Sequence, residues 1–120
     1  MKQIYKVFFS LAILVLFTTS GWAQALFGTL SGTVTDPSGA VVANAKITLR
    51  NADSGDTRDS VTDNQGYYSF ASVPVGTYVV SVEAPGFQGF RVTGVALGGG
   101  ETRSVNATLT VGNTTITVRL

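Results

Sequence analysis

Short runs of alternating apolar and polar residues, separated by turn residues about every ten positions, make up the chain after residue 25. In the first run, Leu30, Gly32 and Val34 share one face while the intervening residues are Ser and Thr. Successive side chains of a strand point to opposite faces, so we expect one face of each run to be buried. The predicted strands cover residues 29–35, 45–50, 57–62, 67–71, 77–83, 87–97 and 101–109. The pattern predicts an all-β fold, a single Greek-key-type β-sandwich of about seven strands.

Turn and edge signals refine this prediction. The segments DPSG at 36–39, DNQG at 63–66 and PVG at 74–76 carry the residues that tight turns require. Residues 57–62 are charged and poor in apolar side chains, so we expect that strand at a sheet edge. Gly89 and Gly94 interrupt the sixth run and indicate a bulge or bend there.

The chain ends in one more alternating run, residues 114–120, in which Ile116, Val118 and Leu120 share a face. We expect residues 113–120 to form an additional edge strand, or a linker to downstream domains that this sequence does not include. The sandwich domain itself is expected to cover residues 26–112.

Residues 1–25 have the three parts of a cleavable signal peptide. Lys2 and Lys6 give a positive start, residues 7–17 are an apolar run, and Ala23-Gln24-Ala25 is a small-x-small cleavage site. The apolar run is shorter than the roughly 20 residues that a membrane-spanning helix needs. We therefore expect an exported protein, periplasmic or outer-membrane-associated, otherwise secreted, whose mature domain does not insert directly into a membrane.

Composition and charge exclude several function classes. Only 12% of the residues are charged and 44% are hydrophobic, which is not the composition of a disordered chain. Without Lys2 and Lys6, six basic residues face seven acidic ones, so the mature chain has a net charge near −1. No basic patch is available for nucleic acid, and we expect no nucleic-acid partner.

The residue types needed for catalysis are scarce. The sequence contains no histidine and no cysteine, which removes the usual nucleophile–base pairs and the imidazole general base. Lys46 is the one lysine after residue 25, and alternation places it on an outward position with no means of lowering its pKa. The sequence predicts a protein that is not an enzyme and binds no cofactor.

Two other kinds of chemistry are weighed and disfavoured. Four acidic residues lie within a short span: Asp53, Asp56, Asp59 and Asp63. Their spacing does not match the EF-hand loop, and Asp is a common turn residue, so no metal site is predicted. An intramolecular isopeptide bond would need Lys46, Asn106 and Glu83 beside one another and buried, whereas alternation places all three outward.

The sequence resembles the carboxypeptidase regulatory-like domain family over about residues 28–112. The resemblance rests on G-x-Y-x-F at 66–70, P-x-G-x-Y at 74–78 and A-P-G-F at 84–87, in combination with the stretch SGTVTDPSGAVVANAKITL at 31–49. It implies a small sandwich related in shape to transthyretin and to starch-binding modules. In peptidases this domain accompanies the catalytic domain and holds no zinc ligands, so the resemblance implies no peptidase activity.

A leader, this domain and then VGNTTITVRL also resemble the start of a TonB-dependent outer-membrane receptor, in which the sandwich precedes a plug and a barrel. The resemblance implies an exported, non-catalytic module with a structural or interaction role, whose partner is a protein of the cell envelope or the downstream plug and barrel.

The alternative is a small carbohydrate-binding module. Sugars stack on exposed aromatic rings, and alternation leaves Tyr67, Phe90 and Phe27 as the aromatic residues for such exposure. The candidate ligand contacts are Tyr67, Asp63, Asn64 and Phe90.

Overall fold

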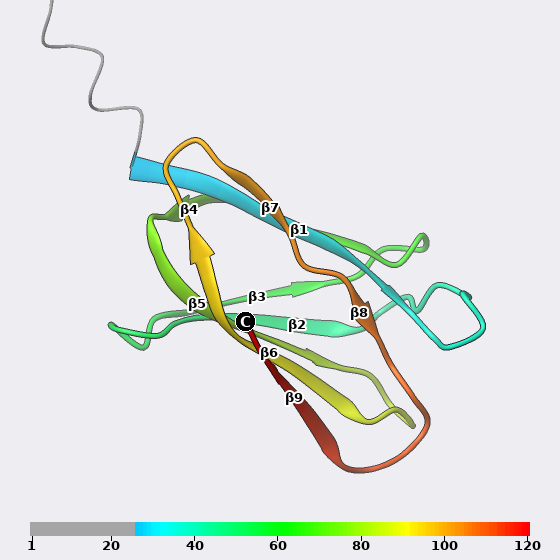
Figure 1. Cartoon of the computed structure of the whole chain (residues 1–120). Coiled ribbons are helices and arrows are strands. Elements are labelled where there is room, and N and C mark those ends of the chain that lie inside the picture. The colour runs from blue at the N-terminus through cyan, green and yellow to red at the C-terminus, as the bar shows by residue number, and fades with distance from the viewer. Residues whose placement is uncertain (1–25) are drawn as a thin grey trace, which may run out of the picture.

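Nine β-strands form two sheets that face each other in a sandwich, over residues 26–120, the part of the chain that the computed structural model describes (Figure 1). The strands are β1 (Phe27–Thr35), β2 (Lys46–Asn51), β3 (Thr57–Val61), β4 (Tyr67–Pro74), β5 (Gly76–Glu83), β6 (Gly89–Leu97), β7 (Thr102–Ser104), β8 (Ala107–Thr108) and β9 (Thr115–Arg119). In the four-stranded sheet, β1 lies between β4 and the β7–β8 segment, and the five-stranded sheet has the order β3-β2-β5-β6-β9. The predicted all-β sandwich is confirmed. The signal peptide predicted for residues 1–25 lies outside the described residues.

The core lies between the two sheets and consists of the side chains that alternation predicted to point inward. Almost fully buried are Leu30, Val34, Ile47, Leu49, Tyr68, Phe70, Tyr78, Val80 and Val82. Burying one Val, Leu or Phe side chain contributes about 1.5–3 kcal/mol, so this set supplies the main driving force for folding. The chain has no cysteine, so no disulfide links the two sheets.

The count of about seven strands was wrong, mainly because residues 101–109 do not form one strand. They form β7 and β8, which both run parallel to β1 and are separated by Val105 and Asn106. The Asn106 side-chain Oδ1 accepts a hydrogen bond from the Thr33 amide at 3.0 Å. A side chain thus takes the place of a backbone acceptor in the ladder, and the regular pairing is interrupted while the chain stays alongside β1.

The connection from β4 to β5 is not the turn predicted at residues 74–76. β4 continues to Pro74 and β5 begins at Gly76, so Val75 alone separates two strands that belong to different sheets. The Tyr78 hydroxyl donates a hydrogen bond to the Pro74 carbonyl at 2.6 Å. Proline is tolerated here because β4 is an edge strand, where a missing amide donor need not break a ladder.

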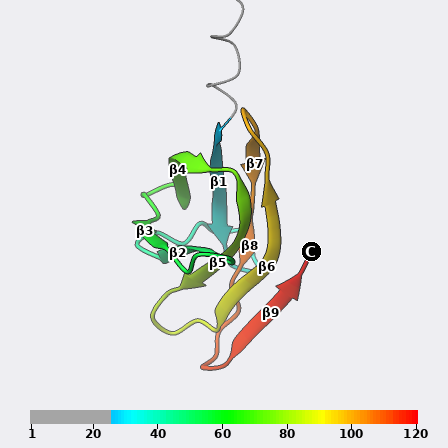
Figure 2. The same ribbon diagram turned by 90° about the vertical axis from the view of Figure 1, so that its left-hand side faces the viewer.

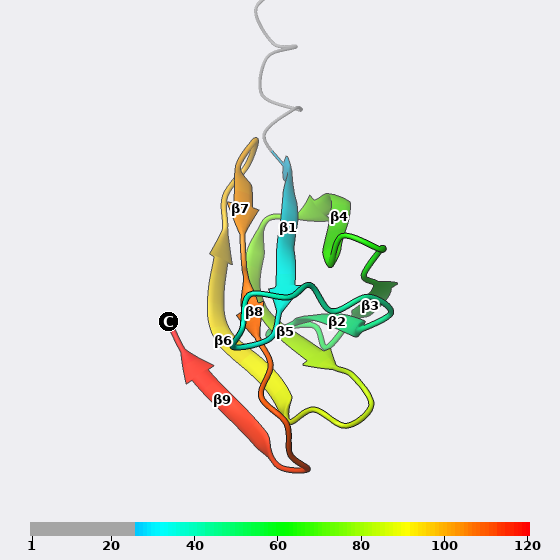
Figure 3. The same cartoon turned by 90° about the vertical axis from the view of Figure 1, so that its right-hand side faces the viewer.

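The predicted bulge and the predicted edge strand are both present. Thr93 and Gly94 together face the single residue Val79, and Gly94 has a φ of 74°, which suits glycine. β3 is the first edge of the five-stranded sheet, and β9 forms the opposite edge by parallel pairing with β6. Figures 2 and 3 show β9 at the border of the molecule, with no segment of the described chain beyond it.

Candidate functional site

The turn before Tyr67 uses the candidate residue Asp63 as a structural acceptor. The Asp63 carboxylate Oδ1 accepts hydrogen bonds from the amides of Gln65 at 2.9 Å and Tyr67 at 3.0 Å. The Gly66 amide in turn donates to the Asp63 carbonyl at 3.0 Å. Asn64 is exposed at the tip. Asp63 therefore shapes the turn, and one of its two carboxylate oxygens is already engaged by the backbone.

The loop from Asp36 to Ala40 repeats this arrangement. The Asp36 Oδ1 accepts from the amides of Ser38 and Ala40, and the Gly39 amide donates to the Asp36 carbonyl. A further hydrogen bond from the Ser38 hydroxyl to the same oxygen lowers the pKa of the Asp36 carboxyl. Because the same D-x-x-G-x turn occurs twice, the acidic residue is explained by turn formation without any ligand.

Tyr67 lies on the outer face of the four-stranded sheet and is 45% exposed, as alternation predicted. It is opposite Thr33 in the β1–β4 register. The same face carries hydroxyl groups and no charge along β4, β1 and β7, at Ser69, Thr29, Thr33, Thr102 and Ser104, while Ser31 is buried. The arrangement offers one aromatic ring and a field of hydroxyls, which suits a neutral polar ligand better than an ionic one.

Phe90 is not part of that surface. It lies on β6 in the other sheet, on the same inward face as Val92, and is half-buried against the core. Phe90 is only part-exposed there, because the chain has already entered the regular β6 alternation at this residue. Phe27 is 49% exposed at the start of β1. The structure therefore brings Asp63, Asn64 and Tyr67 together and leaves Phe90 apart.

The two open sides of the sandwich differ. On the β3–β4 side, Arg58 of β3 donates a hydrogen bond to the Ala71 carbonyl at 2.9 Å, and its guanidinium lies 5.7 Å from the Phe70 ring centre. One side chain thus spans the gap between the sheets and covers the core there. A cation over an aromatic ring adds about 0.5–1 kcal/mol at an exposed site.

The opposite side, between β9 and the β7–β8 segment, is a groove of about 280 Å³. Five apolar side chains and one arginine account for most of its lining: Phe90, Val92, Val105, Val118, Leu120 and Arg103. Ile116 and Val118 lie beside Phe90 and Val92 in the β6–β9 register, yet they remain 42% and 38% exposed. The inner face of β9 thus extends the apolar surface of the sheet beyond the part that the smaller sheet covers.

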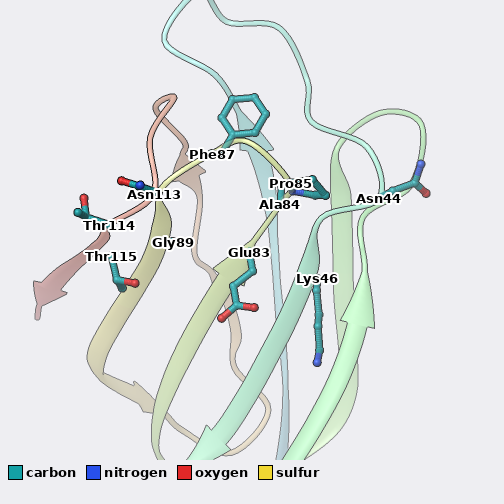
Figure 4. A pocket seen from close by; sticks show the side chains of 10 residues that line it. All are labelled: Asn44, Lys46, Glu83, Ala84, Pro85, Phe87, Gly89, Asn113, Thr114 and Thr115. Carbon is teal, nitrogen blue, oxygen red and sulfur yellow. The ribbon is translucent and has the colours of Figure 1, made fainter.

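A second, open hollow of about 470 Å³ lies at one end of the outer face of the five-stranded sheet (Figure 4). Pro85 and Phe87 supply its apolar part, and Lys46, Glu83 and Thr115 supply polar groups. Figure 4 shows the charged side chains directed away from the Phe87 ring. These polar groups do not converge on one point of the hollow.

The three residues considered for an isopeptide bond, Lys46, Glu83 and Asn106, are all exposed, as predicted. Lys46 and Glu83 face each other on β2 and β5, whereas Asn106 belongs to the other sheet and is bonded to Thr33. The carboxyl group is not desolvated and the amide is not within its neighbourhood, so the geometry does not favour this reaction.

Buried polar groups in the described part of the chain are satisfied. The Tyr68 hydroxyl donates to the Val105 carbonyl, and burial raises the pKa of this phenol. Within residues 26–120, every buried side-chain nitrogen or oxygen has a hydrogen-bond partner, and no group of three acidic side chains is placed to hold a metal ion. Those residues also contain no helix with the length and apolarity needed to cross a membrane.

Sequence reasoning missed three residues that organise these surfaces. Thr62 is buried, accepts a hydrogen bond from the Ala45 amide and donates one to the Val42 carbonyl. Arg58 bridges the sheets and Asn106 interrupts a strand. Asn is unfavourable within strands, so Asn106 carried a signal that the run would break. Nothing local to Arg58 indicated that it would reach another sheet.

Comparison with known proteins agrees with this architecture. The carboxypeptidase regulatory-like domain is the family whose sequence model matches, over residues 29–110. A search of curated protein sequences finds no match. A candidate carbohydrate-binding protein of Bacteroides uniformis superposes with a TM-score of 0.59 at 21% identity, covering 72% of this chain and 42% of that one.

Two further solved structures have the same fold. Another candidate carbohydrate-binding protein, from Pseudomonas aeruginosa, has a TM-score of 0.51 at 21% identity and covers 78% of this chain and 95% of that one. Wild-type catechol 1,2-dioxygenase of Acinetobacter radioresistens has a TM-score of 0.57 at 15% identity, covering 79% of this chain and 55% of the enzyme. This chain spans about half the length of the Bacteroides protein and of the dioxygenase. At these identities the likeness shows the fold alone.

Proposed function

The chain belongs to the carboxypeptidase regulatory-like domain family, and we propose that it acts as a non-catalytic interaction module of an exported protein. The sequence has no histidine or cysteine, and the Asp36 and Asp63 carboxylates accept backbone hydrogen bonds that hold turns. A rigid sandwich of this kind can still present strands, edges and loops to a partner.

The exposed edge strand β9 is the observation that carries this proposal. It pairs with the sheet on one side only, and all five of its residues are exposed. Ile116, Val118 and Leu120 keep apolar surface in contact with solvent next to the groove. An open sheet edge offers backbone hydrogen bonds, and neighbouring apolar side chains add affinity when another strand pairs with it.

An in-cell cross-linking experiment tests β9 as the contact. A photoreactive amino acid at Thr117 should yield a cross-linked adduct in the intact envelope. The same group at Thr57, on the opposite sheet edge in β3, is the matched control and should yield little. Equal yields at the two edges, or no adduct at Thr117, would contradict an interaction through β9.

For cellular context, we propose that the module is the N-terminal extension of a TonB-dependent outer-membrane receptor, on the periplasmic side. The leader-like residues 1–25 and the resemblance of residues 28–120 to the start of such receptors support this. An antibody against the sandwich should detect, in outer-membrane fractions of the source cells, a protein far larger than 12.5 kDa. A band of at most that mass in the periplasm or the medium would favour a separate exported module instead.

Carbohydrate binding is a second candidate, favoured by the exposed Tyr67 ring on an uncharged, hydroxyl-bearing face. A sugar ring can stack on an aromatic side chain while neighbouring hydroxyls hydrogen-bond to it. The candidate carbohydrate-binding proteins with this fold add support at the level of architecture.

Affinity electrophoresis of the full chain in gels that contain neutral polysaccharides tests this candidate. Retardation should disappear in Tyr67→Ala and persist in Tyr67→Phe, which keeps the ring. Asn64→Ala, at the tip of the adjoining turn, tests whether the ligand reaches beyond the tyrosine. Mobility that is the same with and without polysaccharide would refute the candidate, and so would equal retardation of the parent and Tyr67→Ala.

A further inference from the structure

We propose that β9 pairs with β9 of a second copy of this chain, antiparallel and centred on Thr117, to form a symmetric dimer. This inference rests on the proposed role of β9 as a contact strand and names its partner. Three observations support it: the direction of the free backbone groups, the side chains that would face each other, and the contrast between the two edges of the sheet.

Backbone groups of alternate β9 residues are free for a new partner. The Leu120 amide donates to the Thr93 carbonyl at 3.0 Å, and the Gly89 amide donates to the Thr114 carbonyl at 2.9 Å. Even-numbered residues of this strand therefore direct their backbone groups toward β6. Because the direction alternates along a strand, Thr115, Thr117 and Arg119 direct theirs away from the sheet.

An antiparallel register centred on Thr117 uses all of these free groups. Thr117 would face Thr117 of the second copy, and Thr115 of each copy would face Arg119 of the other. In an antiparallel ladder, each hydrogen-bonded pair exchanges two bonds, so the three pairs would form six. The arrangement is isologous, with the same patch used on both copies, as a two-fold dimer requires.

The side chains are self-complementary in this register. On the inner face, Ile116 of one copy would lie opposite Val118 of the other, so two exposed apolar residues would cover each other. On the outer face, Arg119 would lie opposite Thr115, and no like charges meet. Facing β-branched pairs stabilise antiparallel strands, whereas facing like charges destabilise them.

The opposite edge of the sheet shows what β9 lacks. β3 carries the charges Arg58 and Asp59, and both are engaged within the chain, by the Ala71 carbonyl and the Thr48 hydroxyl. Charges on an edge discourage pairing with other chains. β9 has one charge, no proline and no bulge in its pairing with β6. Two five-stranded sheets would join into one of ten strands, within the size that twisted sheets reach.

Charge variants at the centre of the register test the proposal. Sedimentation analysis of the purified full chain should show a dimer. Thr117→Lys should place two lysines opposite each other and weaken the dimer at least tenfold, and Thr117→Asp should do the same. An equimolar mixture of the two variants should form a heterodimer, because only a register centred on this position makes them partners. Far-ultraviolet circular dichroism verifies that each variant is folded.

A single introduced cysteine gives a second measurement, since the chain has none of its own. Thr117→Cys should oxidise to a disulfide-linked dimer, because facing hydrogen-bonded residues lie within disulfide reach. Thr57→Cys, on the β3 edge, is the control and should form no disulfide-linked dimer.

Three results would overturn the proposal: a monomeric parent, a dimer unaffected by Thr117→Lys, or a mixture of the charge variants that does not associate. A monomeric parent that still forms a cross-link at Thr117 to another envelope protein would refute the dimer and leave the interaction module standing. A monomeric parent that also forms no cross-link at Thr117 would refute any role of β9 as a contact strand.

Discussion

Replacing Gly32 with alanine should lower the thermal stability of this sandwich sharply. Gly32 lies in the middle of β1 and faces Tyr68 across the β1–β4 pair. A Cβ at this position would overlap the Val105 carbonyl oxygen and would lie 2.7 Å from the Tyr68 hydroxyl oxygen. These two atoms form the buried hydrogen bond that ties β4 to the segment between β7 and β8. The Val105 carbonyl oxygen belongs to the backbone, so it cannot move aside without disturbing the β7–β8 segment.

The cost of the substitution follows from these contacts. Overpacking a well-packed core costs about 1–3 kcal/mol. Losing a neutral hydrogen bond adds about 1 kcal/mol. The sum is about 2–4 kcal/mol, a large part of the roughly 5–15 kcal/mol by which small domains are stable. For a domain of about this size, each kcal/mol shifts Tm by roughly 4–8 °C, so we expect a drop of at least about 8 °C.

Thermal and urea unfolding, followed by circular dichroism, measure the change. Gly76→Ala is the matched control: the same substitution lies in a strand, where a Cβ would meet only the ends of the Asn51 and Tyr78 side chains at 3.3 and 3.7 Å. We expect it to remain within about 1 kcal/mol of the parent. If Gly32→Ala unfolds within about 4 °C of the parent, or no earlier than Gly76→Ala, the close approach of Val105 to β1 is not as described.

Three further predictions concern buried or turn-forming polar groups. Thr62→Val should cost about 1–3 kcal/mol in urea unfolding, because the Ala45 amide loses its acceptor, and Thr62→Ser should recover most of it; equal losses would contradict this. Burial raises the pKa of the Tyr68 phenol in the folded state above its value in the unfolded chain, about 10. The free energy of unfolding is therefore unaffected below about pH 10 and decreases as pH rises toward the pKa of the folded state. The Tm of the parent should therefore fall faster above about pH 10 than that of Tyr68→Phe, and parallel curves would argue against it. Asp63→Ala should cost about 1 kcal/mol because the Tyr67 amide loses its acceptor, while Asp63→Asn, which keeps Oδ1, should cost less by the same assay.

The candidate site was only partly predictable from the sequence. Alternation correctly placed Tyr67 outward and Tyr68 inward, because neighbouring residues of a strand must point to opposite faces. It could not show that Asp63 would have one carboxylate oxygen occupied by turn amides, since that depends on the detailed backbone path. Nor could it show that Phe90 would lie on the other sheet from Tyr67, because strand pairing decides which sheet a strand joins.

The local pattern allowed an edge strand at residues 113–120, but it could not predict the groove beside β9 or the exposure of its apolar side chains. Ile116, Val118 and Leu120 alternate as regularly as the core strands do. Their exposure follows from the smaller sheet ending before it covers β9, which is a property of the two sheets together. A run of apolar residues at every second position reports which side chains share a face, but not whether a second layer lies over that face.

By itself, the sequence determined the fold class, most strand positions and the inward face of each strand, because alternation and turn chemistry act over a few residues. Only the tertiary structure decided which strands pair. It put β7 and β8 parallel to β1, packed the Val105 carbonyl against Gly32, and left β9 as an open edge. These features depend on contacts between residues far apart in the chain, such as Gly32 with Val105 and Gly89 with Thr115, for which a local pattern contains no information.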